Sequence, residues 1–162
     1  MSTLSECRTL EERVRWVPYG RAFRVVAAVI LGIAGPAKIW SAMGSSKVLQ
    51  LPDPIFGISS ATTLTAVGMV ECGVAVACAL ERRPRWSLIL VAWLSGSFLT
   101  YRFGLSWIGW HRPCPCLGVL TEAIGVPPEV ASKLMLAVAL LLLWGSYSLL
   151  LGQRRLGGAG AV

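Results

Sequence analysis

Charged residues are scarce in this chain: Asp, Glu, Lys and Arg make up only 14% of its 162 residues, and the mean hydropathy is +0.66. With Gly counted as apolar in place of Tyr, the apolar share is about 64%, whereas soluble domains have roughly 45–50%. This excess is too large for an ordinary soluble core, and it also excludes an intrinsically disordered chain. The length suits one domain. We therefore expect a single-domain integral membrane protein.

Four apolar stretches are each close to the roughly 20 residues that a helix needs to cross a bilayer. The chain shows neither an internal repeat nor a low-complexity linker. Because the basic lead before the first stretch is long and no small-x-small site follows, we expect that stretch to be retained rather than cleaved. The sequence predicts an all-α, four-helix transmembrane bundle at 22–151, with spans at 23–43, 60–80, 86–105 and 132–151, an arm at 1–21 and a tail at 152–162.

The net charge of +7 would suggest a nucleic-acid ligand in a soluble protein, but here most basic residues flank apolar stretches. Lys and Arg at helix ends orient membrane proteins, with the more basic side in the cytoplasm. We therefore expect no nucleic-acid partner, and the lipid bilayer as the surroundings. The side with both termini carries Arg8, Arg13, Arg15, Arg21, Arg24, Arg82, Arg83, Arg85, Arg154 and Arg155; the other has Lys38, Lys47, Arg102, Arg112 and Lys133.

This asymmetry predicts that the N and C termini are cytoplasmic and that the loops at 44–59 and 106–131 are extracytoplasmic. The expected location is the inner or plasma membrane of the cell, with a multi-pass topology.

The five cysteines divide by expected compartment. Cys7 lies in the cytoplasmic arm, where thiols stay reduced. Cys72 and Cys78 are six residues apart in the second span, about 9 Å along a helix axis, which is too far for a disulfide. We interpret those two as packing residues. Cys114 and Cys116 fall in an extracytoplasmic loop, where disulfides can form and persist.

Cys114 and Cys116 are separated only by Pro115, so a disulfide between them closes a very small ring. Such a strained disulfide is more oxidising and more labile than a structural one. Positive charge at Arg112 and His111 lowers the pKa of neighbouring thiols and raises their reactivity. We interpret Cys114 and Cys116 as a redox pair supported by His111 and Arg112.

Two other interpretations of this loop remain open. A disulfide there could be a loop staple, although it would constrain very little chain. Two thiolates with His111 also form a ligand set for Cu(I) or Zn(II). The Cys-Pro-Cys motif of copper-transport ATPases lies in a membrane helix, however, and this chain has none of their ATP-handling domains. His111 is alternatively an ordinary solvated loop residue.

Glu71 is the one acidic residue inside the expected spans. An acid at this depth is costly, faces the bundle interior, and is by default a candidate functional residue. Its expected partners are Lys38, Tyr101 or Arg102. The alternative is a purely structural hydrogen bond between helices. Nearby small residues would allow close helix approach: Gly68, Gly73 and Ala75.

Several of these features occur in one family. The chain resembles the MauE/DoxX family of redox-associated membrane proteins over roughly residues 22–151. The resemblance rests on the four spans, Ala34-Gly35-x-x-Lys38, Pro52-Asp53-Pro54-Ile55-Phe56-Gly57, Glu71, and Cys114-x-Cys116-Leu117-Gly118. It implies a four-helix membrane protein that partners periplasmic thioredoxin-like proteins. In methylamine utilisation, the family member supports maturation of a disulfide-rich dehydrogenase subunit.

The predicted function is therefore thiol–disulfide exchange through the Cys-Pro-Cys loop. The partner would be an extracytoplasmic thioredoxin-like protein or a disulfide-containing client, and the process maturation of extracytoplasmic proteins. The alternative is a non-catalytic membrane anchor or a component that binds or transports copper or zinc. We predict no cofactor; a quinone and a soft metal are the alternatives. A self-contained quinone-coupled oxidase is disfavoured, because no second outward cysteine pair is present to relay electrons.

Overall fold

The computed structural model describes residues 3–44, 52–80, 84–109 and 127–158, without the side chains at the two outermost ends. Its helices are α1 (Thr3–Ala42), α2 (Ser60–Ala79), α3 (Pro84–Trp107) and α5 (Pro128–Gly158). All regular elements in the described ranges are helical, apart from a single antiparallel bridge between Pro52 and Ser59. The prediction of an all-α chain is confirmed.

Each of the four helices contains a segment that is long and apolar enough to cross a membrane: Pro18–Ala42, Ser60–Ala79, Arg85–Trp107 and Glu129–Gln153. The shortest has 20 residues, which at a rise of 1.5 Å per residue covers about 30 Å, the thickness of a hydrocarbon core. These segments coincide with the four predicted spans to within a few residues. The structure thus supports a multi-pass membrane protein in contact with lipid.

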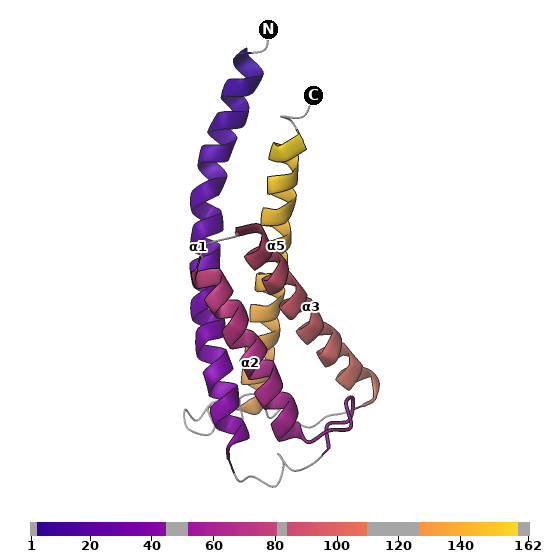
Figure 1. The fold of residues 1–162 in the computed structure, drawn as a ribbon. Helices are drawn as coiled ribbons and strands as arrows, with labels where there is room; N and C mark the ends of the chain where they lie inside the picture. The colour runs from indigo at the N-terminus through magenta and orange to yellow at the C-terminus, as the bar shows by residue number, and fades with distance from the viewer. Residues whose placement is uncertain (1–2, 45–51, 81–83, 110–126, 159–162) are drawn as a thin grey trace.

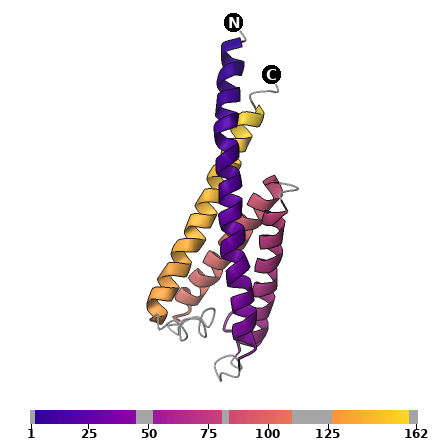
Figure 2. The ribbon, with the colours of Figure 1, turned by 90° about the vertical axis from the view of Figure 1, so that its left-hand side faces the viewer.

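The helices pack mainly as two pairs, α1 with α2 and α3 with α5 (Figure 1). Both chain termini lie at the same end of the bundle, as four successive crossings require (Figures 1 and 2). At that end α1 and α5 extend beyond α2 and α3. Toward the opposite end, α3 diverges from α2 in both views. We call these the terminal end and the loop end.

Two glycines allow α1 and α2 to approach closely. A Cβ atom at Gly35 would lie 2.6 Å from Cys72 Sγ and 2.9 Å from the Gly68 carbonyl oxygen. A Cβ atom at Gly68 would lie 2.8 Å from both the Gly35 carbonyl oxygen and Ile39 Cγ1. No such contact surrounds Gly73. Of the two glycines expected to permit close approach, Gly68 therefore does so and Gly73 does not.

The apolar core lies in the half of the bundle toward the terminal end. A cluster of buried side chains joins all four helices there: Ala27, Leu31, Val74, Ala75, Cys78, Val91 and Leu142. Phe23 of α1 lies against Gly145 of α5, where a Cβ atom would collide with the aromatic ring. The loop-end half has a different interior, which contains most of the buried charge.

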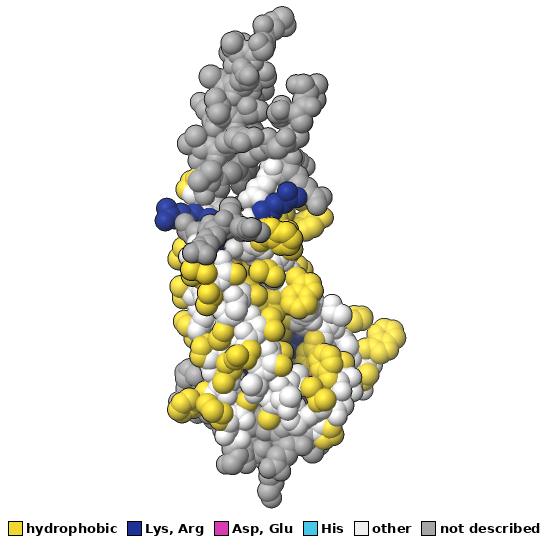
Figure 3. Space-filling view, in the orientation of Figure 1, with side chains coloured by type: hydrophobic (Ala, Val, Ile, Leu, Met, Phe, Trp, Pro, Cys, Tyr) yellow, Lys and Arg dark blue, Asp and Glu magenta, His cyan; other side chains and the backbone are white. Residues whose placement is uncertain are grey.

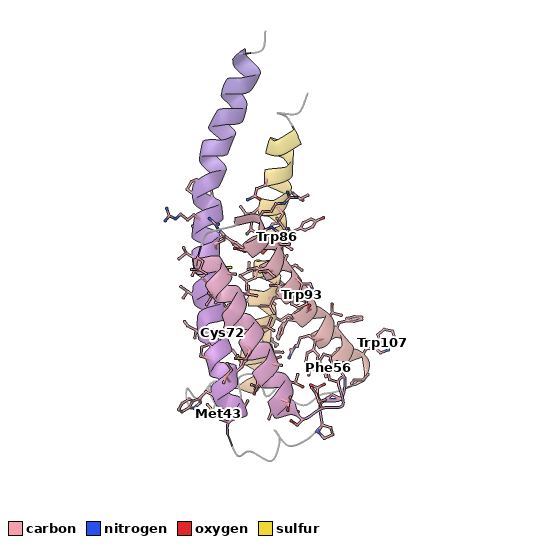
Figure 4. The ribbon with its side chains drawn as sticks, viewed as in Figure 1. Met43, Phe56, Cys72, Trp86, Trp93 and Trp107 are labelled. Carbon is pink, nitrogen blue, oxygen red and sulfur yellow. The ribbon has the colours of Figure 1, made fainter. Side chains whose placement is uncertain are left out.

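The outer surface is that of a protein surrounded by lipid. Many large apolar side chains are exposed, including Ile33, Leu141 and Trp144, and such a surface would be an aggregation liability in water. Figure 3 shows apolar side chains over the helices and Lys and Arg side chains gathered nearer the terminal end. Trp86 lies toward that end and Trp107 at the loop end (Figure 4), as expected for side chains at the two membrane interfaces.

The glycine contact generates a test of the fold. Gly35→Ala should destabilise the bundle by about 1–3 kcal/mol, because the new methyl group has no space and α1 must move away from α2. Gly73→Ala is the matched control: the same change in the neighbouring helix α2 meets nothing within 4 Å. Reversible unfolding of the protein in mixed micelles, followed by circular dichroism, measures both. Equal stability of the two variants would contradict the close contact.

Candidate functional site

Two deeply buried charges form an ion pair between α1 and α2. Lys38 Nζ lies 2.5 Å from Glu71 Oε1, and the two residues are only 2% and 6% exposed. Lys38 is three residues after Gly35, and Glu71 is three residues after Gly68. Because positions three apart share a helix face, the glycine contact brings both charged side chains to the same seam.

Of the three partners expected for Glu71, Lys38 is the one that binds it. Tyr101 instead donates a hydrogen bond of 2.6 Å to Asp53 Oδ2. Arg102 donates to the hydroxyl of Ser132 and so connects α3 to α5. The charge on Glu71 is therefore neutralised within the α1–α2 pair rather than by α3.

The chain before α2 forms a tight turn that Asp53 holds together. Asp53 Oδ1 accepts hydrogen bonds from the backbone N–H groups of Ile55 and Phe56, at 2.9 and 3.1 Å. The Asp53 carbonyl accepts from Gly57 N–H at 2.8 Å, and Gly57 has a φ of +67°, a conformation that favours glycine. Ser59 then caps α2 by accepting from Thr62 N–H, which satisfies a free donor of the first turn.

This turn, residues 52–59, packs against α3. The ring of Phe56 stacks on Tyr101, with centroids 5.8 Å apart and planes 5° from parallel. Asp53 accepts the Tyr101 hydroxyl, and Ile55 lies so near Gly104 that a Cβ atom there would be 3.2 Å from Ile55 Cδ1. The turn thus fills part of the opening between α2 and α3 at the loop end (Figure 4).

Behind the turn lies an interior cavity of about 200 Å³ that all four helices line. Its wall is largely apolar, and its polar groups include the Lys38–Glu71 pair together with Asp53 and Tyr101. Ser60, Thr63, Ser95 and Ser97 also line it. The loop-end half of the bundle therefore contains a partly open space lined by charged and polar residues in an apolar setting.

One carboxylate oxygen of a residue that lines this cavity has no partner among the described residues. Glu71 Oε1 binds Lys38, whereas Glu71 Oε2 is buried and accepts no hydrogen bond. A buried acceptor left unsatisfied costs roughly 1–3 kcal/mol, and more when it is charged. The bundle therefore carries an unsatisfied acceptor on a residue of the cavity wall.

The predicted redox loop lies outside the described residues. Cys114, Cys116, His111 and Arg112 all fall in 110–126, so their predicted roles stay predictions. The segment follows α3 and precedes α5 in the chain. The last turn of α3 and the first turn of α5 both lie at the loop end, the end away from the two termini (Figure 1).

The cysteines that the structure does describe agree with the packing interpretation. Cys72 and Cys78 are both free. Cys72 lies against Gly35 at the α1–α2 contact, and Cys78 is 1% exposed in the apolar core. Within the described ranges, no cluster of three His, Cys, Asp or Glu side chains could hold a metal ion. The metal alternative, Cys114, Cys116 and His111, falls outside those ranges.

Sequence reasoning missed the role of Asp53. Its signal was present, since Asp between two prolines with Gly four residues later favours a turn in which the Asp side chain binds nearby backbone N–H groups. The contact of that turn with Tyr101 could not be read from the same pattern, because Tyr101 lies 48 residues further along the chain.

The ion pair gives the second test. Lys38→Met or Glu71→Leu alone should each cost about 3–5 kcal/mol of stability, because the remaining partner is left as an uncompensated buried charge. Combining the two changes should recover most of that loss, since the double variant buries no charge. Unfolding in mixed micelles measures all three variants. Additive losses in the double variant would show that the two side chains are not coupled.

Comparison of the chain with models of protein families, with curated proteins and with solved structures finds no significant match. Any assignment of function therefore rests on the residues and on the geometry described above.

Proposed function

We propose that this protein is a membrane component that exchanges thiols and disulfides with an extracytoplasmic thioredoxin-like protein through Cys114 and Cys116. The observation that carries the proposal is the Cys114-Pro115-Cys116 motif, in a segment that leaves and re-enters the bundle at the end away from both termini. The resemblance to the MauE/DoxX family supports the same function, with maturation of extracytoplasmic proteins as the process served.

The distribution of charge supports the orientation that this function needs. Ten arginines lie in or just after the arm, within residues 81–85, and in the tail: Arg8, Arg13, Arg15, Arg21, Arg24, Arg82, Arg83, Arg85, Arg154 and Arg155. In chain order, these stretches adjoin the helix ends that lie at the terminal end. In an inner or plasma membrane, that end would be cytoplasmic by the positive-inside rule. The Cys-Pro-Cys segment would then face an oxidising compartment, where disulfide chemistry is sustained.

In the proposed exchange, the thiolate of one cysteine of the pair attacks a disulfide of the partner. A mixed disulfide forms, and the displaced partner sulfur leaves as a thiolate. The second cysteine of the pair then attacks the mixed disulfide through its own thiolate. The products are a Cys114–Cys116 disulfide and a dithiol partner, so two electrons pass to the partner. The same steps in reverse oxidise the partner.

The bundle contributes a fixed support for this segment. Arg102 near the end of α3 binds Ser132 near the start of α5. That contact joins the two helices close to the points where the segment leaves and re-enters the described fold. A metal-binding segment is the competing proposal, with Cys114, Cys116 and His111 as ligands and no transfer of electrons.

Orientation can be tested with variants that retain one cysteine each. In intact cells, a membrane-impermeant maleimide should label the variant that keeps Cys114 and should not label the one that keeps Cys7. A variant that keeps Cys78 is the control, because this buried thiol should react only after denaturation. Labelling of Cys7 but not Cys114 would place the Cys-Pro-Cys segment in the cytoplasm and overturn the proposal.

Redox exchange can be tested by trapping. One of Cys114→Ser and Cys116→Ser should accumulate a mixed disulfide with an extracytoplasmic protein, because the thiol that resolves the adduct is missing. Non-reducing gel electrophoresis, followed by mass spectrometry of the adduct, detects it. Cys72→Ser is the matched control and should yield no adduct.

A metal site predicts a different set of results. Copper or zinc would co-purify with the reduced wild-type protein at about one ion per chain, His111→Ala would reduce that amount, and no variant would trap an adduct. That outcome would replace the redox proposal with metal binding.

A further inference from the structure

We propose that the cavity in the loop-end half of the bundle binds a neutral amphipathic molecule, whose hydroxyl or N–H group donates a hydrogen bond to Glu71 Oε2. The body of this ligand would be apolar and about the size of one substituted aromatic ring. The proposal rests on the interior of the bundle alone. It is independent of the thiol chemistry proposed above, and either can fail without the other.

The first argument is the unsatisfied acceptor. Glu71 is 94% buried, one of its oxygens binds Lys38, and the other has no partner among the described residues. Glu71 also lines the cavity, although Oε2 itself has almost no accessible surface. A rotation of the carboxylate toward the cavity would expose this oxygen, and a hydrogen-bond donor placed there would then remove a desolvation cost that the protein otherwise carries. The site therefore favours a ligand with a donor group over a purely apolar molecule.

The second argument is charge. Lys38 and Glu71 already neutralise each other at 2.5 Å. Asp53 is a further charged residue of the wall, and its carboxylate already accepts hydrogen bonds from Ile55 N–H, Phe56 N–H and the Tyr101 hydroxyl. Each charged group of the described wall is thus already bonded, so an ionic ligand would have to displace one of these contacts to gain a counter-ion. This cost favours a neutral ligand with one polar end.

The third argument is size and shape. The cavity holds about 200 Å³, while an engineered apolar cavity of about 150 Å³ accommodates benzene. Side chains from α1, α3 and α5 form the apolar side, among them Ala34, Leu94, Phe98 and Ala139. The space thus fits one ring with a small substituent.

The fourth argument is the turn at residues 52–59. It is held to α3 by the Asp53–Tyr101 hydrogen bond and the Phe56–Tyr101 stack, and three of these residues line the cavity: Asp53, Phe56 and Tyr101. The turn therefore closes the cavity toward the loop end with side chains that can contact a ligand.

Two matched probes test the proposal on the full-length protein in nanodiscs. 4-Fluorophenol carries the hydroxyl donor, and 4-fluoroanisole has the same ring with the donor replaced by a methyl ether. Fluorine NMR titration, with empty nanodiscs to correct for partition into lipid, gives both dissociation constants. We expect saturable binding of 4-fluorophenol that is about 10-fold tighter than that of 4-fluoroanisole, the effect of one hydrogen bond to a charged acceptor.

Variants then locate the site. Ala139→Leu fills the cavity from α5 and should weaken binding of 4-fluorophenol by 10-fold or more. Ala137→Leu makes the same change two residues earlier at an exposed position outside the cavity, and it should bind like the wild type. In the double variant Lys38→Met/Glu71→Leu, which has no buried acceptor at this point, the two probes should bind equally.

The wild-type comparison is decisive even if a variant fails to fold. Absence of saturable binding above the empty-nanodisc level would overturn the proposal. Equal affinity for the two probes in the wild type would do the same, since it would mean that Glu71 Oε2 is satisfied by water or by the protein itself. Equal binding by the Ala139→Leu and Ala137→Leu variants would place the probe elsewhere.

Discussion

A buried charged pair constrains the rest of this bundle. Removing Lys38 and Glu71 from water is costly, and the cost is offset only while the two side chains stay in contact. That contact fixes how α1 and α2 are rotated about their axes and how far one is shifted along the other. The Gly35–Gly68 contact lies on the same face and provides the closeness that the pair needs. A shift of α1 along α2 would separate the two charges, whereas apolar contacts alone could form again in the shifted position.

The two halves of the molecule differ in how their interiors are filled. Toward the terminal end, apolar side chains of four helices meet and close the interior. Toward the loop end, α3 diverges from α2, and the turn at residues 52–59 fills only part of the space. One half therefore contains the apolar core, and the other contains the cavity, whose lining residues include serines, threonines, Asp53, Glu71 and Lys38. The cavity and the proposed thiol chemistry belong to the same end of the bundle.

The spans could be predicted because a helix needs about 20 mostly apolar residues to cross the hydrocarbon core, and a window of that length along the sequence shows them directly. The Lys38–Glu71 pair was partly predictable for a different reason: a lone acid at that depth needs a partner, and few candidates exist. Which of Lys38, Tyr101 and Arg102 binds Glu71 could not be predicted. A helix that is apolar on every side gives no sequence pattern that shows which face it turns toward its neighbours. The Asp53–Tyr101 bond joins residues 48 positions apart. Only the assembled bundle creates that proximity, and the same holds for the cavity.

Two prolines divide the long helix α1 into segments. Its 40 residues run from Thr3 to Ala42, with Pro18 and Pro36 inside the helix (Figure 1). A proline removes one backbone hydrogen bond of the preceding turn, so each of these positions is a point where the helix can bend. Pro18 stands where the arm meets the first span, and Pro36 stands two residues before Lys38. A bend at Pro18 would redirect the arm without disturbing the ion pair, whereas a bend at Pro36 would move Lys38 away from Glu71.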